Sequence, residues 1–290
     1  MDRRDFISGS IISFIAMQTL SGFRSFADSL GSGEDKMPVL FVGHGSPMNA
    51  IEQNEFTKSW IEMGKSIPKP KAVLCISAHW ETKGTKITAM PKPPTIHDFG
   101  GFPRELNEAL YPAPGNPELA KQTAEHIKKT AILLDQEWGL DHGCWSVLKP
   151  MFPDADIPVL QMSIDYTKSP EYHFELAKEL AYLRSKGVLI LGSGNIVHNL
   201  RMLQWQTPNG GYDWAKEFND KIKGYIQAEE YDKVVRYKEL GKAADLSVPS
   251  NEHFIPLLYS LALREKNEKV SVFNDKAVMG SITMTSYKIG

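Results

Sequence analysis

Residues 186–199 read KGVLILGSGNIVHN, a short apolar run that ends in glycines and is followed by a histidine. An apolar run of four to eight residues bounded by turn residues is typical of a fully buried strand. PVLFVG (38–43) and KAVLCIS (71–77) repeat this pattern, and a histidine again follows each run closely. IPVLQMSI (157–164) is a fourth run of the same kind. The sequence therefore predicts several buried strands that end at polar, glycine-containing loops.

Helical patterns separate these strands. Phe56, Trp60 and Met63 have helical spacing between the first two runs, and residues 117–134 and 170–185 have helical patterns as well. Further helices are expected at 212–229 and 253–264, a strand at 86–90, and paired strands in the last twenty residues. Alternation of strands and helices favours an α/β fold. We expect a single domain with three layers, in which helices cover both faces of a mixed, mostly parallel central sheet.

Composition excludes some functional classes. The chain has 290 residues and a formal net charge of −2, and its body contains no block of lysine or arginine. Nucleic acid is therefore not an expected partner, because nucleic-acid-binding surfaces need a basic stripe. The two cysteines form no CxxC pair, so a thiolate zinc site is not expected. Histidine and carboxylate are the metal ligands that this chain offers.

The first 35 residues have the pattern of an export signal. Arg3 and Arg4 precede a moderately apolar stretch, and Ser25-Phe26-Ala27 offers small residues for a cleavage site. The paired arginines resemble a twin-arginine signal peptide. We therefore expect 1–35 to be a signal and linker and 36–290 to be the folded domain, in a periplasmic or otherwise exported protein. The stretch is too short and polar for a stable membrane span; an uncleaved anchor or a disordered start in a cytoplasmic protein is the alternative.

Four histidines lie at strand ends or at the start of a helix: His44, His79, His198 and His253. The carboxyl ends of strands in an open α/β sheet face one crevice, where ligands bind. We therefore expect the four histidines to meet and to bind one divalent metal ion. A phosphate loop is the rival interpretation for residues 43–47, but the lysine that such a loop needs is missing.

Glu252 and His253 are neighbours, and both are metal-binding residue types. Side chains of adjacent helical residues point about 100° apart, so one of the two is expected to be a ligand and the other an orienting or acid–base group. Both assignments stay open, with Glu252 as the alternative ligand.

Two more histidines, His97 and His142, lie in polar loops that also contain aromatic residues and aspartate. Histidine transfers protons near neutral pH, so both are candidate catalytic residues. The aromatic side chains of Trp80, Phe99 and Trp145 are expected to form apolar walls for a ring-shaped ligand. His126 and His173 are expected on solvated helix faces.

Six motifs occur in a fixed order between residues 38 and 289: GHGSPMNA, SAHWET, HDFGGFP, LDHGCWSVL, GSGNIVHNL and SNEHFIPLL. Together they resemble the class III extradiol ring-cleavage dioxygenases, the LigB-like family, and within it the 4,5-DOPA dioxygenase branch. The resemblance implies that 36–290 is a catalytic domain with a mononuclear non-haem metal. It also implies a small catechol, such as 3,4-dihydroxyphenylalanine, and dioxygen as substrates.

The resemblance also implies residue roles. The metal-binding motifs of the family correspond to His44, His79, His198 and His253, and its catalytic acid corresponds to His142. Relatives that use two histidines and a glutamate leave a second scheme open, in which Glu252 is a ligand and His198 is a base. Fe(II) is the metal expected for dioxygenase activity, with Zn(II) as an alternative occupant of the same site.

Two other functions use the same histidines. A zinc-dependent hydrolase would bind the metal equally well, but it gives no account of the HDFGGFP and LDHGCW loops. A non-catalytic metal-binding protein would not need a crevice lined by loops.

Overall fold

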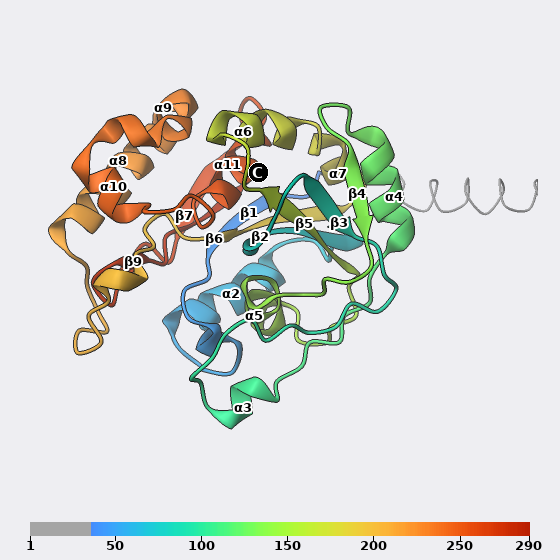
Figure 1. Ribbon diagram of the computed structural model, residues 1–290, viewed down its shortest axis with the longest axis horizontal. Helices are drawn as coiled ribbons and strands as arrows, with labels where there is room; N and C mark the ends of the chain where they lie inside the picture. The colour runs from blue at the N-terminus through green and yellow to red at the C-terminus, as the bar shows by residue number, and fades with distance from the viewer. Residues whose placement is uncertain (1–35) are drawn as a thin grey trace, which may run out of the picture.

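An eight-stranded sheet forms the centre of the computed structural model, which describes residues 36–290 (Figure 1). The predicted signal at 1–35 lies outside the described residues. The strand order is β4-β3-β5-β2-β6-β1-β10-β7. In chain order these strands are β1 (Val39–Gly43), β2 (Ala72–Thr82), β3 (Thr85–Thr88), β4 (Ile132–Asp135), β5 (Val159–Asp165), β6 (Val188–Gly194), β7 (Val270–Phe273) and β10 (Ser286–Ile289).

The sheet is mixed and mostly parallel, as predicted. The four central strands β5, β2, β6 and β1 are parallel to one another. Towards one edge, β3 is antiparallel to β5 and parallel to β4. Towards the other edge, β10 is antiparallel to both β1 and β7, which confirms the paired strands expected at the end of the chain.

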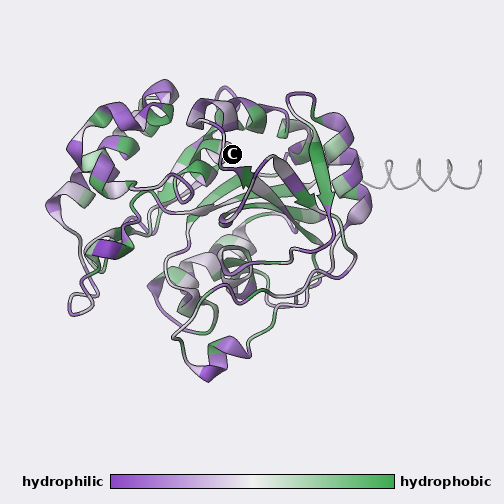
Figure 2. Ribbon diagram, viewed as in Figure 1, coloured by the Kyte–Doolittle hydropathy of each residue, from purple (hydrophilic) through white to green (hydrophobic). Residues whose placement is uncertain are grey.

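Alternating side chains of the central strands build two separate cores. In β1, Val39 and Phe41 belong to one apolar cluster, whereas Leu40 and Val42 belong to the other. This alternation follows from the two-residue period of a strand. Helices α4, α6, α8 and α11 contribute to the first cluster, and α2 and α5 contribute to the second. Figure 2 shows the hydrophobic colour concentrated in the strands between these layers. The protein therefore has the three-layer α/β architecture that the sequence predicts.

The helices are η1 (Pro47–Ala50), α2 (Glu55–Ser66), α3 (Arg104–Asn107), α4 (Pro117–His126), α5 (His142–Met151), α6 (Pro170–Lys178), α7 (Ala181–Ser185), η2 (Leu200–Met202), α8 (Asp213–Gln227), α9 (Tyr231–Val235), η3 (Tyr237–Leu240), α10 (Lys242–Ser247) and α11 (Ile255–Ala262). The short strands β8 (Ala277–Val278) and β9 (Ile282–Thr283) pair with each other. Within residues 36–290, none of the helices has both the length and the apolar character needed to cross a bilayer.

The helix predicted over 117–134 is too long. It ends at His126, because the backbone amides of Lys128 and Lys129 donate to the Glu179 carboxylate rather than continuing the helix. Residues 132–135 then form β4 and pair with β3. An apolar run of this length is compatible with either structure, and tertiary pairing decides between them.

The solvent-exposed position predicted for His173 is also wrong. Its side chain is fully buried between α6 and α11, where Nδ1 lies 3.0 Å from the Tyr259 hydroxyl oxygen. Nε2 lies 3.2 Å from the Asp165 carbonyl oxygen. Both ring nitrogens thus have partners, which makes burial of this polar ring tolerable. His126, in contrast, is exposed as expected.

Candidate metal centre and active site

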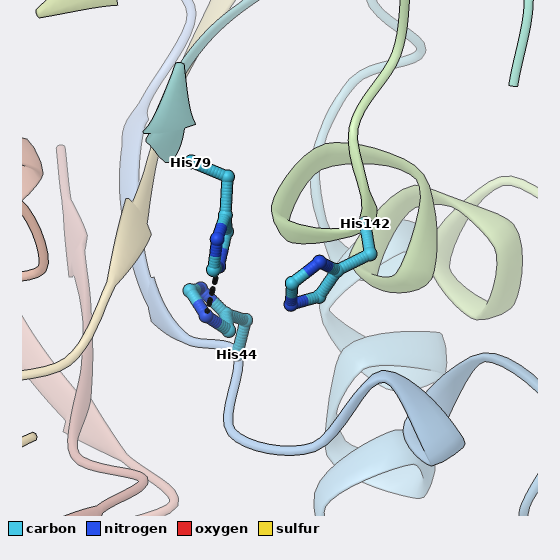
Figure 3. A group of neighbouring side chains, drawn as sticks. All are labelled: His44, His79 and His142. Atoms are coloured by element: carbon cyan, nitrogen blue, oxygen red, sulfur yellow. Dashed lines mark hydrogen bonds between the residues drawn. The ribbon is translucent and has the colours of Figure 1, made fainter. Parts of the chain in front are cut away.

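Five histidines lie close together beside the ends of three parallel strands. His44 directly follows β1, His79 lies near the end of β2, and His198 lies four residues beyond β6. His142 is the first residue of α5, and His253 lies in the turn before α11. With Glu252 they form two groups of possible metal ligands, one of His44, His79 and His142 and one of His198, Glu252 and His253. Figure 3 shows the first group, with the three rings facing a common space. The convergence predicted from the strand-end pattern is therefore present.

Hydrogen bonding fixes the tautomer of His44. Its Nδ1 lies 3.0 Å from the Ser193 hydroxyl oxygen, and that hydroxyl donates to the carbonyl oxygen of Gly143. A hydroxyl has a single hydrogen. Ser193 must therefore accept from Nδ1–H, and the Nε2 atom of His44 is left with a free lone pair.

His79 directs a second lone pair to the same place. Its Nδ1 lies 3.6 Å from Oδ2 of Asp98, and the attraction of this carboxylate favours a proton on Nδ1. Its Nε2 lies 3.1 Å from Nε2 of His44 (Figure 3). Two ligands that each lie about 2.1 Å from one ion, at angles between tetrahedral and right angles, are roughly 3.0–3.4 Å apart. The spacing of the two nitrogens thus fits two ligands of one cation.

His253 contributes a third lone pair. Its Nδ1 lies 3.0 Å from Oε1 of Glu252, which as a carboxylate accepts the Nδ1 hydrogen. The ring is only 6 % exposed, and Nε2 has no hydrogen-bond partner among the described residues. A buried polar atom without a partner is costly, so this nitrogen fits a bound metal. The His253 ring lies 5.3 Å from the His44 ring and 5.0 Å from the His79 ring.

A glycine of β6 allows His253 to reach this position. The backbone amide of Asn195 donates to the carbonyl oxygen of His253 at 2.8 Å. A Cβ atom on Gly194 would lie 2.1 Å from that oxygen. The glycine therefore lets the turn before α11 approach the end of β6.

His198 has a different geometry. Its ring stacks on the His253 ring, with a centroid distance of 3.4 Å and an interplanar angle of 8°. The lone pair of an imidazole nitrogen lies in the ring plane. Two parallel rings this close cannot both direct in-plane lone pairs at one ion about 2.1 Å away. The stack thus distinguishes His198 from the three histidines described above.

His142 is held by Asp98. Its backbone N–H and its Nδ1 each lie 2.9 Å from an oxygen of the Asp98 carboxylate, so Nδ1 carries a proton and Nε2 is free. Burial raises the pKa of Asp98, but the hydrogen bonds and charge of His142 outweigh that effect and the pKa is lowered. Asp98 was not among the predicted site residues. The one available signal was its place beside His97 in the proline-rich segment PKPPTIHDFGGFP (91–103), because long loops in compact domains often line a site.

A second carboxylate, Asp141, supports the start of α5. It accepts hydrogen bonds from the Ser77 hydroxyl at 2.7 Å, the Gln161 amide at 2.6 Å and the backbone amide of Cys144. Gly143 then packs against the His79 side, where a Cβ atom would lie 2.4 Å from the Ser77 oxygen and 2.8 Å from Cδ2 of His79. These contacts fix His142 relative to His79.

Burial keeps the histidines neutral. It lowers the pKa of His79 to about 3 and that of His198 to about 4, with the charge of His142 acting in the same direction. Burial also lowers the pKa values of His44 and His253 well below the usual range. Neutral imidazole is the form that binds metals. At neutral pH the site is thus ready for a cation without releasing protons from these rings.

A cavity of about 950 Å³ opens above the histidines. Of the three aromatic walls predicted, only Phe99 lines it. Trp80 instead stacks on Trp138, and Trp145 is buried with its indole N–H donating to the carbonyl oxygen of Ile96. The apolar lining comes from segments remote in sequence: Phe99, Phe102, Leu200, Leu203, Trp205, Met279 and Ile282.

His97 does not join the group. Its Nε2 lies 2.9 Å from the carbonyl oxygen of Ala109, and its ring packs against Phe99 and Trp145. It does not line the cavity. In this position the side chain holds the loop that carries Asp98 and Phe99.

Comparison with known proteins agrees with this geometry. The family model described as the catalytic LigB subunit of aromatic ring-opening dioxygenase matches residues 38–290. The chain belongs to the LigB family. Its relatives include the 4,5-DOPA dioxygenase extradiol of Escherichia coli K12, which is 46 % identical over 88 % of this chain and 95 % of the relative. The protein of the same name from Beta vulgaris is 34 % identical over 89 % of this chain and 98 % of the relative.

A solved structure supports the same relationship. The crystal structure of an uncharacterized Escherichia coli K12 protein is similar with a TM-score of 0.77 and 41 % identity, covering 88 % of this chain and all of that one. The predicted enzyme class, a LigB-type extradiol ring-opening dioxygenase with a divalent metal, is therefore confirmed. The zinc hydrolase alternative is not favoured.

The lowered histidine pKa values predict acid sensitivity of the metal-free LigB protein. An unfolded histidine titrates near pH 6.5, whereas His79 and His198 titrate at about 3 and 4 in the fold. Between these values the unfolded chain binds more protons, so the free energy of unfolding falls as the pH drops below 6.5. Each such histidine contributes about 1.4 kcal/mol per pH unit.

Urea unfolding of chelator-treated protein between pH 8 and pH 4.5 measures this dependence. We expect His198→Gln to reduce the slope of the unfolding free energy against pH by the contribution of one histidine, about 1.4 kcal/mol per pH unit. Equal slopes in the wild type and this variant would contradict the prediction.

Proposed function

We propose that the protein is an Fe(II)-dependent extradiol dioxygenase that opens the ring of a catechol such as 3,4-dihydroxyphenylalanine by 4,5-cleavage. The observation that carries the proposal is the set of three Nε2 lone pairs, from His44, His79 and His253, beside the His142–Asp98 pair. The names of the relatives from Escherichia coli and Beta vulgaris support the choice of substrate.

In this proposal His44, His79 and His253 are the metal ligands. His44 and His253 each have a hydrogen-bond acceptor for the Nδ1 hydrogen, and His79 has the Asp98 carboxylate 3.6 Å from its Nδ1, which resembles the usual arrangement around a metal-binding histidine. Glu252 then orients His253 rather than binding the ion. When bound, a redox-active divalent metal supplies the one-electron chemistry by which a catechol reacts with dioxygen.

His198 acts as the base in this scheme. It lines the cavity, and its lowered pKa leaves it unprotonated at neutral pH. An unprotonated imidazole next to the ligand set is placed to accept a proton from a catechol hydroxyl. Its stacking on His253 holds the ring beside the proposed ligands.

His142 acts as the acid. Asp98 holds its Nδ1 hydrogen, so Nε2 faces the cavity and can carry the proton that the product needs. Phe99 packs edge-on against the His142 ring and, with the other apolar residues, keeps water away from the reacting ring. We assign His97 the structural role of anchoring this loop.

We also propose that residues 1–35 direct export through the twin-arginine route, with 36–290 as the exported catalytic domain. Support comes from Arg3 and Arg4 and from the family match, which begins only at residue 38. We expect the full chain to be recovered in the periplasmic fraction of a bacterial host and the Arg3→Lys/Arg4→Lys variant to stay in the cytoplasm. Equal distribution of the two would refute the export proposal.

Metal reconstitution tests the proposed chemistry. Chelator-treated protein is loaded anaerobically with Fe(II) or Zn(II), mixed with 3,4-dihydroxyphenylalanine and then exposed to oxygen. We expect oxygen uptake and a yellow ring-opened product with iron only, because zinc has no redox chemistry. Ester hydrolysis with zinc, without oxygen uptake by the iron form, would overturn the proposal.

Replacement of His142 tests whether this residue acts as an acid rather than as a metal ligand. We expect His142→Gln to keep its iron but to lose about 10²-fold or more in kcat, because general acid catalysis is removed. Metal analysis and oxygen-uptake kinetics measure the two effects. His97→Gln is the matched control and should stay within a few-fold of wild type; normal turnover by His142→Gln would refute the acid assignment.

A further inference from the structure

The charged groups that line the active-site cavity are all acidic apart from the histidines. Glu81, Asp98 and Glu252 line it, whereas no lysine or arginine side chain does so among the described residues. Asp98 is engaged by His142. Glu81 and Glu252 are therefore the carboxylates that remain to face a bound molecule.

Glu81 is placed to meet the part of the substrate that projects away from the metal ligands. It lies two residues beyond His79 on β2, and both side chains line the cavity, whereas the side chain of Trp80 between them does not. Two residues of a strand span about 7 Å, a distance comparable to the length of a catechol with a short tail. Glu81 forms no ion pair or side-chain hydrogen bond with the residues that the structure describes, and it is exposed to the cavity.

The position of the reacting end is fixed independently. The unpartnered, buried Nε2 of His253, which lines the same cavity, belongs to the proposed metal site, and the diol end of the substrate is expected there. Glu252 lies between His253 and Glu81. One of its oxygens accepts the Nδ1 hydrogen of His253, and its negative charge adds to the negative potential around Glu81. At the cavity mouth Trp205 is 71 % exposed and adds an aromatic face, which attracts cations as carboxylates do.

We propose that Glu81 is a specificity-determining residue that binds the ammonium group of a catechol with an aminoalkyl tail. This inference rests on the proposed function and narrows its substrate class. A cationic tail meets Glu81 and the charge of Glu252, whereas a carboxylate tail meets only like charges. The amine, rather than the carboxylate, is thus the recognised end of an amino-acid substrate, and a catecholamine without the carboxylate is also a substrate.

Three catechols with different tails test the proposal: dopamine, the uncharged 4-methylcatechol and the anionic dihydrocaffeate. We measure kcat/KM with the iron-loaded enzyme. We expect wild type to prefer dopamine to dihydrocaffeate, and Glu81→Gln to reduce that ratio about three- to fivefold, as for the loss of one exposed charge pair. Glu62→Gln removes the same charge from the outer face of α2 and should leave the ratio unchanged.

Binding provides a second readout that does not need turnover. Calorimetric titration of the zinc-loaded protein with dopamine and dihydrocaffeate gives the same selectivity as a ratio of Kd values. Loss of the amine preference in Glu81→Gln supports the inference even if iron gives no ring cleavage, in which case only the proposed function fails. Cleavage of 4-methylcatechol without any amine preference, or with an unaltered ratio in Glu81→Gln, overturns the inference and leaves the dioxygenase function standing.

Discussion

Polar partners on the Nδ1 side of three histidines are the constraint from which the rest of the site follows. Ser193 and Glu252 take the Nδ1 hydrogens of His44 and His253, and the Asp98 carboxylate lies 3.6 Å from Nδ1 of His79 and attracts its hydrogen. Each ring therefore presents an unprotonated Nε2 to the centre. Facing lone pairs repel one another, and buried unpaired nitrogens are costly. A cation in the space between them would remove both costs, so we expect metal binding to stabilise the fold.

The central sheet sets the spacing between the clustered histidines. Adjacent parallel strands end side by side, so β1, β2 and β6 deliver His44, His79 and the turn that leads to His198 at one edge. Small residues then let further segments approach closely. Without Gly194 the turn with His253 would collide with β6, and without Gly143 the start of α5 would collide with the Ser77 and His79 side chains. The same elements that build the core therefore set the positions of the clustered histidines.

Sequence patterns predicted the part of the site that depends on strand ends. His44 and His79 follow buried runs directly, so their convergence required only the rule that parallel strands end at one edge. The different geometry of His198 and His253 became visible only from the stacking of their rings. The position of Glu252 became clear only from its hydrogen bond with Nδ1, rather than Nε2, of His253. Neither has a local sequence signal. Asp98 was overlooked because its partner, His142, lies 44 residues away in the chain.

Contacts between residues far apart in the sequence also explain the wrong predictions about the fold. Residues 132–135 are apolar enough for a helix or a strand, and the free edge of β3 decides for a strand. His173 lies among charged neighbours in the sequence, but Tyr259 and Asp165 offer partners for both ring nitrogens only after α6 packs on α11. Trp80 and Trp145 were predicted to line the cavity. Trp80 instead points to the other face of β2 and stacks on Trp138, because side chains alternate along a strand. Trp145 is buried in the core, where its indole N–H donates to the Ile96 carbonyl oxygen.

The Asp98 carboxylate links His79, a proposed metal ligand, to His142, the proposed acid. Oδ2 of Asp98 lies 2.9 Å from Nδ1 of His142 and 3.6 Å from Nδ1 of His79. A positive charge on His142 lowers the pKa of His79, whereas the charge of Asp98 raises it. The charge states of His142 and His79 are therefore coupled through Asp98. If His142 is the proposed acid and His79 a proposed ligand, loss of the His142 proton would leave the full charge of Asp98 to act on His79 and would strengthen its donation to a bound cation.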